Sequence, residues 1–223
     1  MKPFTSYRDR LCSIALRFKS FLAYNFGRRD SPGKAINSDT ETCRGVRIRT
    51  GWSLIMDMNL IALNMYLNEL GVPLVIDTIT DRKRVQKAVY LGQAIGAELN
   101  YEFNWYVHGP YSTDLTRDYY KLAGALLAGE LPTGGNTQSP GEPQLKESVR
   151  EKLKALAPVI QKPDNFPLEQ ADWMELVSSL HYLRTVDKLD PSEARRVIST
   201  QKPHLLEYVD QAETKLKEVK LLS

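Results

Sequence analysis

Cysteine is scarce in this 223-residue chain, and its placement limits the chemistry available to most of the sequence. Cys12 and Cys43 both lie in the first 52 residues, so residues 53–223 can form neither a disulfide nor a thiolate metal site. This use of cysteine is typical of a reducing compartment, and we expect a cytoplasmic protein. No apolar run approaches the ~20 residues of a transmembrane helix, so we expect no membrane span.

Recognisable catalytic motifs are missing as well. The chain has no Walker loop, no dinucleotide-binding fingerprint and no H-E-x-x-H sequence. His181 lies in an apolar helical pattern typical of a core or boundary position. His108 has no serine or cysteine nucleophile motif beside it, and the acidic residues recur at spacings typical of solvated helix faces. We therefore predict a protein that is not an enzyme and binds no cofactor or metal; an enzyme acting through His108 and Tyr111 is an alternative.

Charge is distributed unevenly along the chain. Residues 1–52 contain eleven basic and four acidic side chains, whereas residues 53–223 contain 19 basic and 23 acidic ones. The polar, arginine-rich first segment predicts a basic, poorly ordered extension, because it has too little apolar surface to offset the entropy lost on ordering. It fits a transit or surface-binding helix, a nucleic-acid-binding arm, or an upstream leader with the natural start at Met56 or Met58. The mildly acidic remainder argues against a broad phosphate-binding surface there.

Residues 53–223 have the pattern of one compact, mainly α-helical domain with a short β-strand or hairpin. Apolar spacing, capping residues and proline positions predict about seven helices. Six longer helices are expected at residues 58–70, 81–95, 113–127, 144–157, 168–186 and 204–222. A seventh, short helix is expected to begin at Asp190-Pro191 and to end before Pro203. Thr80 or Asp81 is the expected N-cap of the second helix. Glycines and prolines predict a loop over residues 131–143.

An aromatic segment is expected to form the strand. From Tyr101 to His108, aromatic and apolar residues alternate with polar ones, which predicts a half-buried strand. Gly109 and Pro110 should end it, because proline cannot donate to a ladder. Ser112 then fits the N-cap of the next helix. Residues 109–112 can thus be explained by structural roles alone: a turn, an aromatic side chain that packs into the core, and a helix cap. The alternative is that Tyr111 and its neighbours also line a binding surface.

Two segments carry a family resemblance. Residues 84–93 read R-V-Q-K-A-V-Y-L-G-Q, and residues 105–112 read W-Y-V-H-G-P-Y-S. Together they resemble the signature of the Panacea (SocA-like antitoxin) superfamily, in particular its uncharacterised YwgA-like branch, over roughly residues 58–210. The chain departs from the pattern at Arg84, where the family has lysine, and at Tyr111-Ser112, where the wider superfamily has G-P-V. The resemblance implies a small, cytoplasmic, mostly helical domain that binds a protein and has no established catalytic residues.

The resemblance leads to a functional prediction. We expect a non-enzymatic protein-interaction domain of antitoxin or adaptor type, whose partner is a toxin or a defence-system protein. The predicted partner-binding residues are Arg84, Gln86, Lys87, Tyr90, Gln93, Tyr106, His108, Gly109, Pro110, Tyr111 and Ser112. The alternative is a nucleic-acid-binding transcriptional regulator with a winged-helix-like fold, in which Arg82, Lys83, Arg84 and Lys87 contact phosphates.

Lys87 has two opposite interpretations. Its helical position shares a face with Arg84 and Leu91, which indicates partial exposure unless the amine is paired. Because the family signature retains a basic residue at this position, we expect the amine of Lys87 to connect its helix to the turn at residues 109–112. In that case its removal would leave a buried acceptor unsatisfied.

Overall fold

A computed structural model describes residues 51–129 and 143–222 of the chain. The chain divides into one unit over Met1–Ile55 and a second over Met56–Ser223, and the second contains the features discussed below. The predicted N-terminal extension falls outside the described residues up to residue 50, and the predicted loop over residues 131–143 does so up to residue 142.

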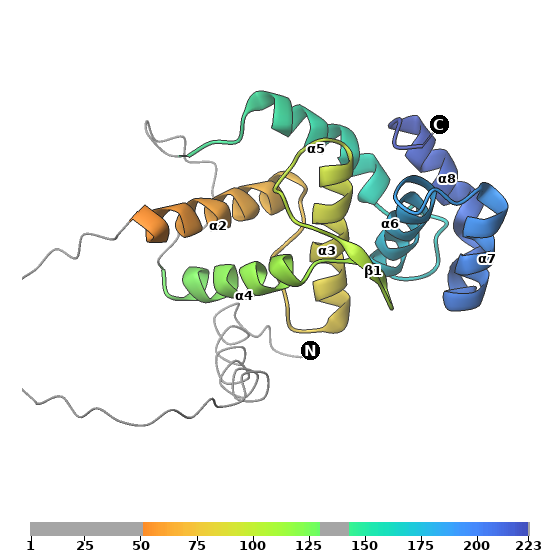
Figure 1. The fold of residues 1–223 in the computed structure, drawn as a ribbon, viewed down its shortest axis with the longest axis horizontal. Coiled ribbons are helices and arrows are strands. Elements are labelled where there is room, and N and C mark those ends of the chain that lie inside the picture. Colours follow the sequence, from red (N-terminus) through yellow and green to blue (C-terminus); the bar gives the residue numbers. More distant parts are fainter. Residues whose placement is uncertain (1–50, 130–142, 223) are drawn as a thin grey trace, which may run out of the picture. The chain divides into compact units, whose positions relative to one another are not determined.

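The fold is mainly helical with a small antiparallel hairpin, as the sequence predicts (Figure 1). The α-helices in the described ranges are α2 (Gly51–Glu69), α3 (Ile79–Ala94), α4 (Thr113–Leu127), α5 (Glu147–Ile160), α6 (Gln170–Thr185), α7 (Pro191–Gln201) and α8 (Val209–Glu218). They are accompanied by the 3-10 helix η1 (Pro203–Tyr208) and by the strands β1 (Asn104–Tyr106) and β2 (Gly109–Tyr111). None of the helices in the described part of the chain combines the length and apolar character needed to cross a bilayer.

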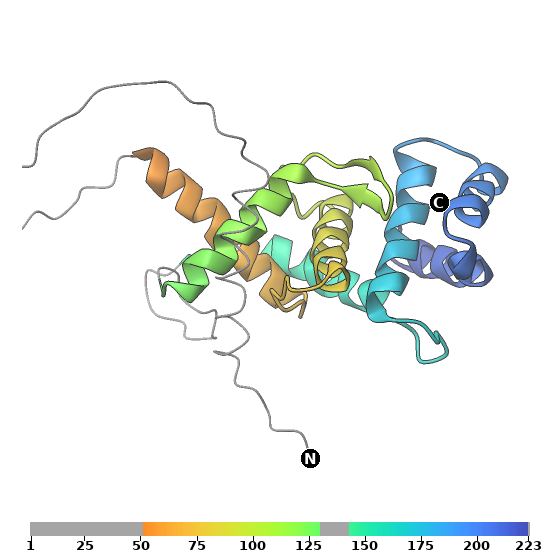
Figure 2. The same ribbon diagram turned by 90° about the horizontal axis from the view of Figure 1, so that it is seen from below.

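Helix α6 is the centre of the second unit. It separates α3 from α7 and α8 in both views (Figures 1 and 2), and it packs against all three helices and against β2. Apart from Asp172, every residue from Ala171 to Leu183 is buried. A helix that is buried on every side leaves no solvated face for its polar residues, so those residues need partners inside the protein.

Helix α3 begins at a reciprocal cap. The hydroxyl of Thr78 accepts a hydrogen bond from the Asp81 amide, and the Asp81 carboxylate accepts one from the Thr78 amide at 3.1 Å. The prediction that Thr80 or Asp81 is the N-cap was therefore wrong, because Asp81 takes the return position of a capping box that begins at Thr78. From Val85 to Gly92 the helix is buried without interruption.

The β1–β2 hairpin differs from the predicted strand. β1 covers three residues, and the chain then reverses through Val107 and His108 so that Trp105 pairs with Pro110. The expectation that Gly109 and Pro110 end the strand was wrong, because a two-stranded ribbon has only edge strands, and an edge strand tolerates proline. Val107 was expected to face inward, but it is 65% exposed because it lies in the turn.

Three other boundaries are informative. Ser112 caps α4 as predicted, accepting a hydrogen bond from the Leu115 amide. Helix α5 continues through Pro158 to Ile160, beyond its predicted end. The predicted last helix over residues 204–222 is split into η1 and α8. Apolar spacing cannot separate these two forms, because both place residues i and i+3 on one face.

Candidate functional site

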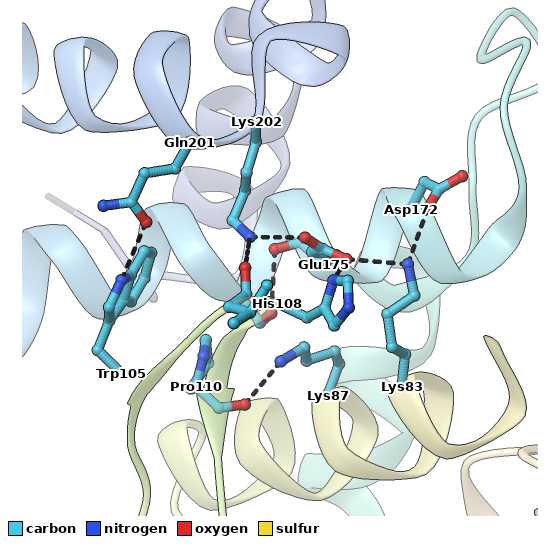
Figure 3. Close-up of polar contacts among 11 residues, drawn as sticks. Lys83, Lys87, Trp105, His108, Pro110, Asp172, Glu175, Gln201 and Lys202 are labelled. Atoms are coloured by element: carbon cyan, nitrogen blue, oxygen red, sulfur yellow. Dashed lines mark hydrogen bonds and ion pairs between the residues drawn. The ribbon is translucent and has the colours of Figure 1, made fainter. Parts of the chain in front are cut away.

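A polar cluster with a buried centre lies where the hairpin meets α3 and α6. We call it the lysine–glutamate cluster, and it consists of Lys83 and Lys87 from α3, Asp172 and Glu175 from α6, Lys202 from the link between α7 and η1, and His108 from the hairpin turn (Figure 3). Its members come from segments far apart in the sequence, so the cluster exists only in the folded chain.

Glu175 is the central acceptor of this cluster. One carboxylate oxygen, Oε1, lies 2.6 Å from the amine of Lys202, and the other, Oε2, lies 2.9 Å from the amine of Lys83. Oε2 is also 3.3 Å from Nδ1 of His108. Burial alone would raise the pKa of Glu175, but the charges and hydrogen bonds of Lys202 and Lys83 outweigh it and lower the pKa to about 2. Glu175 is therefore ionised at neutral pH.

Lys202 joins α6 to the hairpin turn. Its side chain is 1% exposed, and its amine donates both to Glu175 and to the carbonyl of Val107 at 2.9 Å. The amine also lies 5.7 Å from the ring centroid of Trp105. The neighbouring Gln201 accepts a hydrogen bond from the Trp105 indole at 3.2 Å (Figure 3). The end of α7 thus holds both β1 and the turn that follows it.

Lys87 holds the other strand of the hairpin. Its amine donates to the carbonyl of Pro110 at 2.6 Å, and the residue is 2% exposed. This confirms the prediction that Lys87 connects its helix to residues 109–112. Gly109–Tyr111 form β2, however, and the turn lies at Val107 and His108. Among the described residues no carboxylate forms an ion pair with Lys87. Burial lowers the pKa of Lys87 to about 7; the attraction of Glu175 opposes this shift, and repulsion from Lys202 and Lys83 reinforces it.

Gly109 allows the hairpin to approach α6 closely. Its φ is +82°, a conformation that favours glycine. A Cβ atom at this position would lie 2.3 Å from the hydroxyl oxygen of Ser179. That hydroxyl is buried and has no hydrogen-bond partner among the described residues. The backbone of β2 at Gly109 therefore packs directly against Ser179 of α6.

Two glutamines of α3 hold the segments on either side of the hairpin. The amide of Gln86 donates to the Ser112 carbonyl at 2.8 Å and accepts from the Ser112 N–H at 2.9 Å. Gln93 makes the same pair of hydrogen bonds to the backbone of Tyr101, both at 2.9 Å. Residues 84–93, the α3 segment that resembles the family signature, thus position the chain both before β1 and after β2.

The structure divides the predicted partner-binding residues into two groups. Gln86, Lys87, Tyr90, Gly109, Pro110 and Ser112 are buried, whereas Arg84, Gln93, Tyr106, His108 and Tyr111 are partly or fully exposed. Tyr90 is hydrogen-bonded to Nδ1 of His181 at 2.8 Å, and Arg84 pairs with Asp81. In the buried group, Lys87 and Gln86 hold β2 and the residue that follows it. The exposed group includes side chains of the hairpin that face solvent.

The hairpin presents an aromatic and apolar surface to solvent. Tyr106 is 62% exposed, Val107 is 65% exposed, and the side chain of His108 is 47% exposed. The ring of Tyr106 lies 5.6 Å from that of Tyr111, which is half-buried on the adjacent strand. We call Tyr106, Val107 and His108 the hairpin tip.

The four cations expected at nucleic-acid phosphates all have partners within the protein. Arg82 donates to the carbonyls of Ile76 and Asp77, and Arg84 pairs with Asp81. Lys83 and Lys87 belong to the lysine–glutamate cluster described above. These contacts do not favour a phosphate-binding role for this face of α3.

Sequence reasoning missed Glu175, Ser179 and Lys202. The acidic residues were expected on solvated faces, and for Glu175 this was wrong, since it is 3% exposed. A signal was present, because a helix with apolar residues on all sides buries its polar residues too. Nothing in the local sequence identified Lys202 as a partner of Glu175, because that contact depends on where the end of α7 lies.

The ion pairs and hydrogen bonds of the cluster hold the hairpin against α3 and α6. Both oxygens of Glu175 are engaged by cations, and the amines of Lys87 and Lys202 donate to hairpin carbonyls. No group of three or more histidine, cysteine or acidic side chains in the described residues is arranged to hold a metal ion.

Searches against family models, curated proteins and solved structures found no match to the chain. The Panacea resemblance therefore stays a prediction.

Proposed function

We propose that the chain is a non-enzymatic protein-interaction domain of antitoxin or adaptor type, and that it binds its partner through the hairpin tip. The observation that carries this proposal is the contrast between exposed Tyr106 and Val107 and the buried lysines that hold the same hairpin. An aromatic residue presented on a fixed backbone is typical of the anchors that contribute most to protein–protein affinity.

Rigidity of the backbone supports this role for the tip. Lys202 holds the carbonyl of Val107 within the turn, and Lys87 holds that of Pro110 on β2. A turn already fixed in its bound conformation loses less conformational entropy when a partner binds. The buried cluster therefore contributes to binding indirectly, by holding the hairpin in place.

The identity of the partner rests on the family resemblance alone. Residues 84–93 and 105–112 resemble the Panacea signature, whose members neutralise toxins or serve as adaptors. A toxin or a defence-associated protein is accordingly the proposed partner class.

Affinity purification of the full tagged chain from its native host tests the proposal. We expect a stoichiometric protein partner with the wild-type chain and at least a tenfold weaker complex with the Tyr106→Ala, Val107→Asp double variant. Leu127→Asp is the matched control, because Leu127 is also exposed and lies at the far end of α4, about 20 Å along the helix from Ser112. Loss of binding only in the tip variant, with unchanged melting temperature in both, supports the proposal.

Two results would count against it. One is the absence of any stoichiometric protein partner under several growth conditions. The other is a partner that the tip variant retains at full affinity, measured by calorimetry with both purified proteins, which would place the interface elsewhere.

A further inference from the structure

The lysine–glutamate cluster contains more cationic groups than its carboxylates can pair. Lys202 occupies one oxygen of Glu175, while Lys83 lies between Glu175 and Asp172. Among the described residues, the amine of Lys87 has only the neutral carbonyl of Pro110 as its hydrogen-bond partner. Lys87 is nevertheless among the largest fully buried side chains of the described residues.

The groups that face Lys87 come from every element around it. Lys83 lies on the same helix, Lys202 at the end of α7 and His108 on the hairpin. Glu175 lies on α6, as does the hydroxyl of Ser179, which has no hydrogen-bond partner in the described part of the chain. When Lys87 is neutral, Lys83 and Lys202 balance Asp172 and Glu175. When Lys87 carries a proton, one positive charge is left in a buried region without a carboxylate of its own.

We propose that Lys87 couples the seating of the β1–β2 hairpin to protonation: the neutral amine holds the hairpin on α3 and α6, and proton uptake by Nζ favours its release. No covalent bond changes, and the proton is taken from solvent. Release exposes Lys87 to water, where the ammonium is fully solvated. Release of the hairpin by protonation does not require the hairpin tip to bind a protein.

The direction and size of the effect follow from proton linkage. The released hairpin should leave Lys87 with its ordinary pKa of 10.5, whereas the seated hairpin lowers that pKa to about 7. The equilibrium constant for opening should therefore rise roughly tenfold per unit as pH falls from 10 to 8. It should rise roughly tenfold more between pH 8 and pH 6, and level off below about pH 6.

Hydrogen exchange on the full chain measures this opening. We expect the protection factors of hairpin amides over residues 104–112, corrected for intrinsic exchange rates, to be about tenfold lower at pH 6 than at pH 8. Lys87→Met, which retains the length of the side chain without its amine, should abolish the difference. His108→Gln should retain most of it, which separates the lysine from the histidine that faces Glu175. Equal protection at both pH values in the wild-type chain would overturn the proposal.

A titration of the wild-type chain gives an answer even if Lys87→Met fails to fold. In a ¹³C spectrum of chain labelled at the lysine Cε positions, one lysine should titrate with a midpoint near pH 7. If every lysine of the folded protein titrates above about pH 9, Lys87 is charged at neutral pH and the proposal is wrong. Neither readout involves a partner, so failure here is distinguishable from failure of the proposed binding function.

Discussion

The amine of Lys202 lies 2.6 Å from Oε1 of Glu175, and both side chains are buried. The two residues are 27 positions apart, at the end of α7 and within α6. Through the carbonyl of Val107, the same amine also reaches the hairpin turn. A single ion pair thus joins three parts of the fold and positions the surface that we propose for partner binding.

Replacement of Glu175 should be strongly destabilising. Glu175→Gln leaves Lys202 and Lys83 without their shared carboxylate, and breaking a buried ion pair from one side costs about 3–5 kcal/mol. Asp172→Asn is the matched control, since Asp172 is 22% exposed and Lys83 keeps its bond to Glu175. We expect the control to cost less than about 1 kcal/mol. Urea denaturation measures both losses, and equal losses would show that the buried pair has no special role.

Acid should remove the stabilisation that Glu175 provides. Its pKa is lowered from 4.5 to about 2 in the folded chain, so the stabilising contribution is complete above pH 4.5 and is lost as pH falls towards 2. Within that window, the free energy of unfolding should decrease by about 1.4 kcal/mol per pH unit because of this group. The measurement is the difference between wild type and Glu175→Gln in urea unfolding at pH 6, 5, 4 and 3. A difference that stays constant from pH 5 to pH 3 would contradict the assignment.

Gly109 and Ser179 should be energetically coupled. Gly109→Ala places a methyl group 2.3 Å from the Ser179 hydroxyl at a positive φ, and we expect a loss of about 3 kcal/mol. Ser179→Ala removes a hydroxyl that has no partner in the described residues, so alone it should change stability by less than about 1 kcal/mol. In the Ser179→Ala background, the cost of Gly109→Ala should fall by at least about 1 kcal/mol. A double-mutant cycle from thermal or urea melts measures the coupling, and strictly additive losses would rule out the close contact.

Gln86 should stabilise the junction between β2 and α4. Gln86→Met leaves the buried N–H of Ser112 without its acceptor, at a cost of about 1–3 kcal/mol. The carbonyl of Ser112 retains the Thr116 amide and hydroxyl, so only one backbone group loses its partner. Gln144→Met is the control, because Gln144 is exposed, and it should cost less than about 0.5 kcal/mol. Comparable melting temperatures for the two variants would contradict this role for Gln86.

Local sequence determined the helices and several of their ends. Ser112 and the Asp190-Pro191 pair cap their helices as predicted, because a cap depends on residues within one turn of it. The contact between α3 and residues 109–112 could also be predicted, through the basic residue at position 87. The extent of the hairpin could not be predicted, because β1 pairs with β2, and β2 is placed by its packing against α3 and α6.

Only the tertiary structure decided which polar residues form the candidate site. The sequence around Glu175 does not identify Lys202 or Lys83 as its partners, since the three residues meet only after α6 is enclosed by α3, α7 and the hairpin. The same enclosure turns Lys87 from a helix-face cation into a buried amine beside two other lysines. Helix formation is governed by neighbours in the chain, whereas the charge state of a buried group is governed by every group that surrounds it.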